Sequence, residues 1–88
     1  MARMIQADSL GLSKMSAAPT FKEAQIFVGG LVETITLRGS GMLLVSEEGL
    51  LKGLPINHTA SHLAKRPIVG AAILLETEDE VTRTLGEV

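Results

Sequence analysis

One carboxylate in this sequence occupies a position where an apolar side chain is expected. Glu33 lies in residues 31–37, whose valine, isoleucine and threonines are typical of a strand. Side chains alternate between the two faces of a strand, so Glu33 shares a face with Leu31, Ile35 and Leu37. A carboxyl group on an apolar face is a candidate acid or ligand contact. The alternative is a structural role at the strand start, where Glu33 bonds backbone N–H groups or a cationic partner.

Two histidines four residues apart raise the question of a metal site. His58 and His62 would share one face of a helix, and such a pair can ligate zinc. No glutamate lies between them and no third ligand is evident, so we favour surface or capping histidines and predict no metal. The nearby basic step Lys65-Arg66 can meet an acidic partner or a phosphate.

The remaining candidate residues lie at predicted turns and helix ends. Gly29 and Gly30 could hold a loop open for an anion, but they follow a predicted helix, whereas phosphate loops precede one. A helix C-cap explains Gly29. Glu47 and Glu48 are adjacent and read as a solvated turn. Asn57 is predicted to cap the next helix or to hold the loop before it by hydrogen bonds.

No constellation typical of catalysis is evident. The chain has no cysteine, which excludes a thiol nucleophile, a thiolate metal site and a disulfide. No serine lies in a G-x-S-x-G elbow. We therefore predict a protein that is not an enzyme and has no cofactor. An enzymatic alternative would need Glu33 as its acid or base.

Composition limits the class of protein further. The length of 88 residues predicts one domain, residues 1–88. The net charge of −2 and the presence of only two aromatic residues disfavour nucleic-acid binding. No apolar run is long enough to span a membrane and no signal peptide is recognisable, so we expect a cytoplasmic protein. A hydrophobic content of 45% is high for so short a chain. Either the core is unusually complete or another subunit covers apolar surface, and we favour a homo-oligomer, with a dimer preferred.

Capping and periodicity predict three short helices. A capping box of Thr20 and Glu23 starts a helix over residues 21–28, which Gly29 ends. Asn57 starts a second helix to about residue 64, and Thr77 starts a third that ends at Gly86.

Strands are predicted from β-branched and apolar runs. We expect them at residues 3–7, 31–37, 42–46 and 68–76, with short ones near 14–15 and 50–51 and a turn at 38–41. The apolar run at 68–76, which Gly70, Ala71 and Ala72 interrupt, suits a central strand covered on both faces, or covered on one face by a partner. Hairpin connections favour an α+β fold: a small, mainly antiparallel sheet of about four to five strands, with two to three short helices packed on one side of it.

The central motifs resemble a known family. Residues 28–33 read V-G-G-L-V-E, residues 45–57 read V-S-E-E-G-L-L-K-G-L-P-I-N, and residues 67–70 read P-I-V-G. Together they resemble the family called domain of unknown function 3846, whose members occur in bacteria, phages and mobile elements. Ser46 stands where the family often has asparagine, and His58 where it more often has a basic or another polar residue. The resemblance implies a phage or mobile-element accessory protein and gives no mechanism.

Two functions remain open from the sequence. The first is a non-enzymatic accessory protein that binds and modulates a host or phage protein through an apolar face or sheet edge of residues 68–75 or 42–45. The second is a protein that binds or sequesters a nucleotide or signalling metabolite. The residues that would make these contacts are Gly29, Gly30, Glu33, Asn57, His58, His62 and Arg66.

Overall fold

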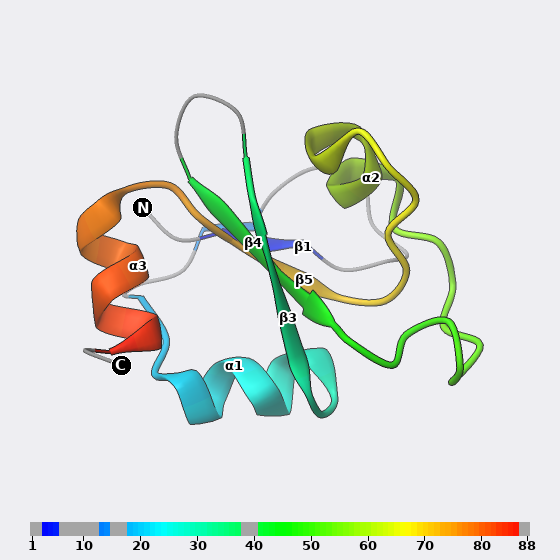
Figure 1. The fold of residues 1–88 in the computed structure, drawn as a ribbon, viewed down its shortest axis with the longest axis horizontal. Coiled ribbons are helices and arrows are strands. Elements are labelled where there is room, and N and C mark those ends of the chain that lie inside the picture. The colour runs from blue at the N-terminus through cyan, green and yellow to red at the C-terminus, as the bar shows by residue number, and fades with distance from the viewer. Residues whose placement is uncertain (1–2, 6–12, 15–17, 38–40, 87–88) are drawn as a thin grey trace.

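An antiparallel sheet forms the centre of the computed structural model, which describes residues 3–5, 13–14, 18–37 and 41–86. Its order is β2-β1-β5-β4-β3 (Figure 1). The strands are β1 (Arg3–Ile5), β2 (Ser13–Lys14), β3 (Val32–Thr36), β4 (Met42–Ser46) and β5 (Ala72–Leu75), and the helices are α1 (Phe21–Val28), α2 (His58–Ala64) and α3 (Glu78–Leu85). The α+β class and the mainly antiparallel sheet predicted from the sequence are confirmed.

Strands β3, β4 and β5 carry most of the pairing. β3 pairs with β4 from Val32↔Ser46 to Thr36↔Met42, and β4 pairs with β5. The predicted count of four to five strands depends on β1 and β2, which add only the short pairings β1–β5 and β1–β2. The described residues contain no helix long and apolar enough to cross a membrane.

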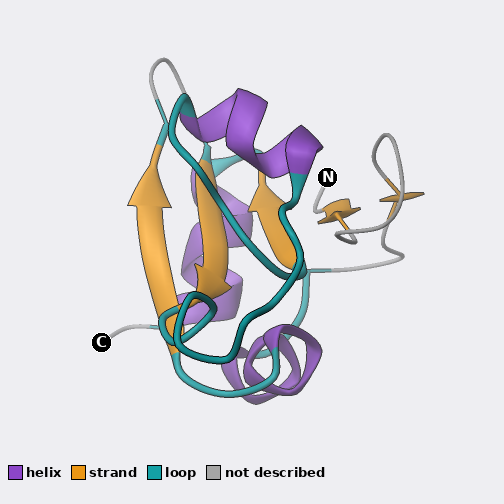
Figure 2. Cartoon of the chain, turned by 90° about the vertical axis from the view of Figure 1, so that its right-hand side faces the viewer, coloured by secondary structure: helices purple, strands orange, loops and turns teal. Residues whose placement is uncertain are grey.

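The helices cover both faces of the sheet (Figure 2). On one face, Leu43 and Leu74 pack with Ala60 of α2. On the other, Leu44 and Ile73 pack with residues of α1 and α3. The expectation that all helices lie on one side is therefore wrong. All residues of β5 and most of β4 are buried, so both faces of these strands need apolar cover.

Local capping signals set the helix boundaries as predicted. Thr20 Oγ1 accepts a hydrogen bond from Glu23 N–H, and the Glu23 carboxylate accepts one from Thr20 N–H, which completes the capping box of α1. Gly29 ends α1 in the left-handed conformation, with φ of 88°. Thr77 accepts from Glu80 N–H at the start of α3.

Two predicted strands differ from the structure. Leu50 and Leu51 lie in a turn, 82% and 87% exposed, so the predicted short strand there is wrong. The strand predicted at residues 68–76 is shorter and begins at Ala72, because Gly70 has φ of +82° and interrupts the extended backbone. Val69 still forms an isolated bridge with Ile56. The turn predicted at residues 38–41 lies mostly outside the described residues.

Candidate functional site

Glu33 and Arg66 are brought together by the fold. The Arg66 guanidinium donates to Glu33 Oε2 at 3.2 Å, and the two side chains are 47% and 50% exposed for Glu33 and Arg66 respectively. Glu33 lies on the same face as Ile35, which packs with the α2-side core, so its predicted parity is correct. Glu33 is half-exposed at the solvent-accessible edge of that face, however, where it pairs with Arg66. The structural alternative for Glu33 therefore describes its contacts.

Asn57 has a structural role. Its side chain is fully buried. Oδ1 accepts from Ala60 N–H at 3.0 Å, which caps α2, and Nδ2 donates to the Gly70 carbonyl at 2.8 Å. The predicted helix cap is present, whereas the side-chain amide holds Gly70, which follows α2, and not the predicted loop before the helix. The buried side chain presents nothing to a ligand.

His58 and His62 are exposed on α2. Among the described residues, no group of three or more histidine, aspartate or glutamate side chains could hold a metal ion. Two imidazoles without a third ligand make a weak zinc site.

Adding zinc to the purified protein is expected to leave its melting temperature unchanged within about 1 °C, because a ligand that binds weakly stabilises little. Differential scanning fluorimetry with and without excess zinc measures this directly. A zinc-dependent rise that disappears in His62→Ala would contradict the prediction.

Gly29 and Gly30 are joined to a distant turn. Lys52 Nζ donates to the Gly29 carbonyl at 2.8 Å and lies 3.8 Å from Glu48 Oε1. This contact ties the turn at residues 47–53 to the end of α1. A phosphate loop needs free backbone N–H donors, but the N–H groups of Gly29 and Gly30 both donate to the Gln25 carbonyl, so the pair has a structural role.

Near this contact, large apolar side chains are exposed. Ile26 is 72% exposed, and Leu31 is also exposed. Leu50 and Leu51 lie in the turn that Lys52 holds against α1. These four residues are called here the sheet-end surface. Sequence reasoning missed it because Leu50 and Leu51 were assigned to a strand.

Strand β3 is a terminal strand of the sheet and has β4 as its neighbour (Figure 2). Strands β4 and β5 are interior, so the predicted use of residues 42–45 or 68–75 as a binding edge is wrong. Each of these strands already has a neighbour on both sides. The terminal strands among the described residues are β2, with two residues, and β3, with five, so β3 is the longer edge.

The register of β3 shows which backbone groups this edge presents. Glu47 N–H donates to the Leu31 carbonyl at 2.9 Å, and Leu37 N–H donates to the Gly41 carbonyl at 3.1 Å. Hydrogen-bonded pairs alternate along an antiparallel ladder, so the odd-numbered residues between these points bond to β4. The even-numbered residues direct their N–H and C=O groups away from the sheet. They are Val32, Thr34 and Thr36.

This edge lacks the usual protection against strand pairing. Natural edges carry lysine, proline, bulges or inward-pointing charges. β3 reads V-E-T-I-T, and its pairing with β4 runs without a bulge. Its single charge, Glu33, is held in a half-exposed ion pair with Arg66 on one face of the strand. The V-E-T-I-T sequence can be read from the chain alone, but it indicates an open edge only once β3 is known to be a terminal strand.

Four surface cavities adjoin the β3 segment. One of about 600 Å³ includes Leu31, and one of about 220 Å³ includes Glu33. Two more, of about 710 Å³ and 490 Å³, both include Thr36 and Leu37. If an extended peptide paired with β3, every second side chain of the peptide would face these cavities and could enter them.

Comparison with known proteins places the chain in a family. A protein-family model with the description Domain of unknown function (DUF3846) matches residues 4–87. No curated protein matches the chain, and no solved structure matches it. The resemblance drawn from the central motifs is confirmed, and the chain belongs to the family described as Domain of unknown function (DUF3846).

Proposed function

We propose that this domain is a non-enzymatic accessory protein, of the phage or mobile-element type, that binds a host or phage protein by strand addition to β3. The observation that carries the proposal is the unprotected β3 edge, with the backbone groups of Val32, Thr34 and Thr36 directed outward. In strand addition, main-chain hydrogen bonds supply affinity and flanking pockets supply specificity.

The surroundings of β3 support the same mode of binding. The sheet-end surface offers apolar contact at the N-terminal end of β3, and the cavities near Thr36 lie at the other end. Exposed apolar side chains that lie together, as Ile26 and Leu31 do at one cavity, are typical of sites that bind another protein. The residues predicted for a small-molecule site support that alternative less, because Asn57 is buried and Gly29 is tied to Lys52.

The substitution Thr34→Pro tests the proposal. Proline removes the outward N–H of residue 34 and leaves the β3–β4 ladder intact, because residue 34 does not bond to β4. We expect peptides selected from a random display library on the immobilised domain to bind the variant at least about tenfold more weakly, the loss expected for a bond and its neighbours in the added strand. Fluorescence anisotropy measures the affinities.

The matched control is Thr34→Val, which keeps the N–H and the strand propensity and should bind as the wild type does. Hydrogen exchange followed by NMR should show the amides of Val32, Thr34 and Thr36 protected only when peptide is present. Equal binding by Thr34→Pro, with its fold intact by thermal melting, would overturn the proposal. Protection of these amides in a stable dimer without peptide would also overturn it, since the edge would then belong to a second copy.

A further inference from the structure

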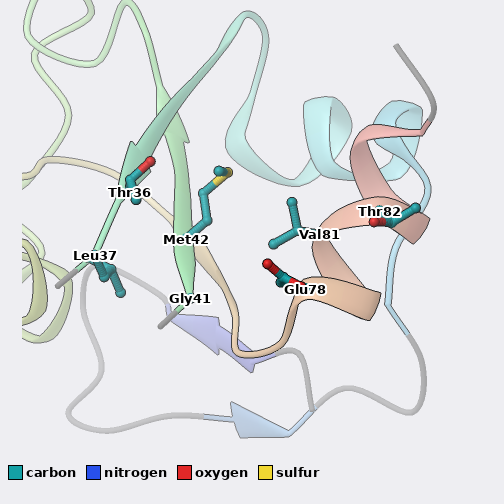
Figure 3. Close-up of a pocket in the computed structure, with 7 residues that line it drawn as sticks. All are labelled: Thr36, Leu37, Gly41, Met42, Glu78, Val81 and Thr82. Atoms are coloured by element: carbon teal, nitrogen blue, oxygen red, sulfur yellow. The ribbon is translucent and has the colours of Figure 1, made fainter. Parts of the chain in front are cut away.

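One of the cavities along β3 has apolar walls and one acidic residue at its rim. It measures about 710 Å³ and lies between the β3–β4 pair and α3. Met42 projects from β4 and Val81 from α3 into the same space, with Glu78 one turn before Val81 (Figure 3). Both apolar side chains pack against the core cluster on this face, so the walls are fixed in place.

Glu78 differs from the two acids that follow it. Asp79 pairs with Arg83 at 3.0 Å, and Glu80 accepts a hydrogen bond from Glu76 N–H at 3.0 Å. No ion pair involves Glu78 within the part of the chain that the structure describes. Its carboxylate is therefore the charge in this cavity that has no cationic partner among those residues.

The register of β3 determines which residue of an added strand would lie beside this cavity. Val32 packs with the core on the α1 and α3 side, so Thr34 and Thr36 face the same side. In an antiparallel pair, directly opposite side chains lie on one face. A residue opposite Thr36, which itself lines the cavity, would share the face of Met42 and Val81 but lie about 10 Å, two strand spacings, from Met42, so only a long side chain would reach them.

We infer that this cavity binds a lysine or arginine side chain of the added strand, with its methylene stem against Met42 and Val81 and its cationic group at Glu78. Long basic side chains bury their stems on apolar surface and keep the charged group at the rim. A carboxylate beside an apolar wall matches that shape and charge. The inference depends on the proposed strand addition and adds the chemistry of one recognised side chain.

Two labelled peptides test the inference. Both are extended hexapeptides of alternating valine and threonine; one carries a central arginine and the other norleucine at that position. We expect the wild type to bind the arginine peptide about two- to fivefold more tightly, the range for a partly exposed charge pair. Glu78→Gln should remove this preference, and Asp79→Asn should retain it, because Asp79 does not line the cavity.

The outcomes separate the inference from the proposed function. If neither peptide binds at millimolar concentration, strand addition itself fails. If both bind equally to the wild type, and Glu78→Gln changes nothing, strand addition stands and the cationic site is wrong. A preference lost equally in Glu78→Gln and Asp79→Asn would indicate a general effect of acidic charge and would also overturn the assignment. Melting temperatures of both variants show that α3 remains folded, since each loses one acid from its first turn.

Discussion

Asn57→Ala is expected to lower the free energy of unfolding by about 3 kcal/mol. Loss of the Oδ1 bond to Ala60 N–H removes the cap of α2, which costs about 1 kcal/mol. Loss of the Nδ2 bond leaves the Gly70 carbonyl without that partner in a buried place, at about 1–3 kcal/mol. For a domain of this size the melting temperature should fall by about 12–24 °C. Urea unfolding followed by circular dichroism measures the free energy.

Two substitutions serve as controls. His58→Ala changes the next residue along the chain, which is exposed, and should cost less than about 0.5 kcal/mol. Asn57→Ser keeps an oxygen for Ala60 N–H but is too short to reach the Gly70 carbonyl, so its cost should lie between the other two. If Asn57→Ala costs no more than His58→Ala, the structural assignment of Asn57 is wrong and it returns to the candidates for binding.

The parts of the fold that were predictable depend on neighbours in sequence. The helix from Phe21 to Val28 has the predicted bounds because its capping box and its terminal glycine act within one turn. The same holds for the helix that Asn57 starts. The hairpin of β3 and β4 is also local, and its strands lie where β-branched and apolar residues concentrate.

Which faces of the sheet the helices cover was harder to predict, because two features of the sequence gave conflicting indications. Hairpin connections favoured helices on one side of the sheet. The apolar run at residues 68–76 favoured a strand covered on both faces, and the structure shows β5 buried on both. Burial decides the outcome, because a strand with two apolar faces is stable only when both are removed from water.

The candidate site shows the same limit. Strand parity placed Glu33 on the correct face, but its partner Arg66 lies 33 residues away in sequence and nothing local connects them. The open edge of β3 was missed for a similar reason. Whether a strand is terminal depends on the order of the whole sheet, and the same five residues in an interior strand would present no free backbone groups.

The family motifs acquire a structural explanation. Asn57 N–H donates to the Ile68 carbonyl and Gly70 N–H to the Pro55 carbonyl, both at 2.8 Å. Ser61 Oγ bonds both the N–H and the carbonyl of Ile68. The G-L-P-x-N element and the I-x-G element thus clasp each other ahead of β5. These two motifs maintain the fold ahead of β5, and the strand addition proposed for β3 does not depend on them.

Gly70→Ala is expected to cost about 2–3 kcal/mol in the free energy of unfolding. Gly70 has φ of +82°, a conformation that costs a residue with a Cβ atom about 1–2 kcal/mol. A Cβ atom would also lie 2.7 Å from Leu54 Cδ1, the end of that side chain, so the leucine has to shift at a cost of about 1 kcal/mol. Chemical denaturation measures the total.

Gly53→Ala separates these two causes. Gly53 also has positive φ, at +66°, but a Cβ atom there would have no heavy atom within 4 Å. It should therefore show the conformational cost alone, about 1 kcal/mol. The double variant Gly70→Ala/Leu54→Ala, compared with Leu54→Ala, should recover the contact part of the Gly70→Ala cost. If Gly70→Ala costs no more than Gly53→Ala, Leu54 does not pack tightly on Gly70, and the clasp is held by its hydrogen bonds alone.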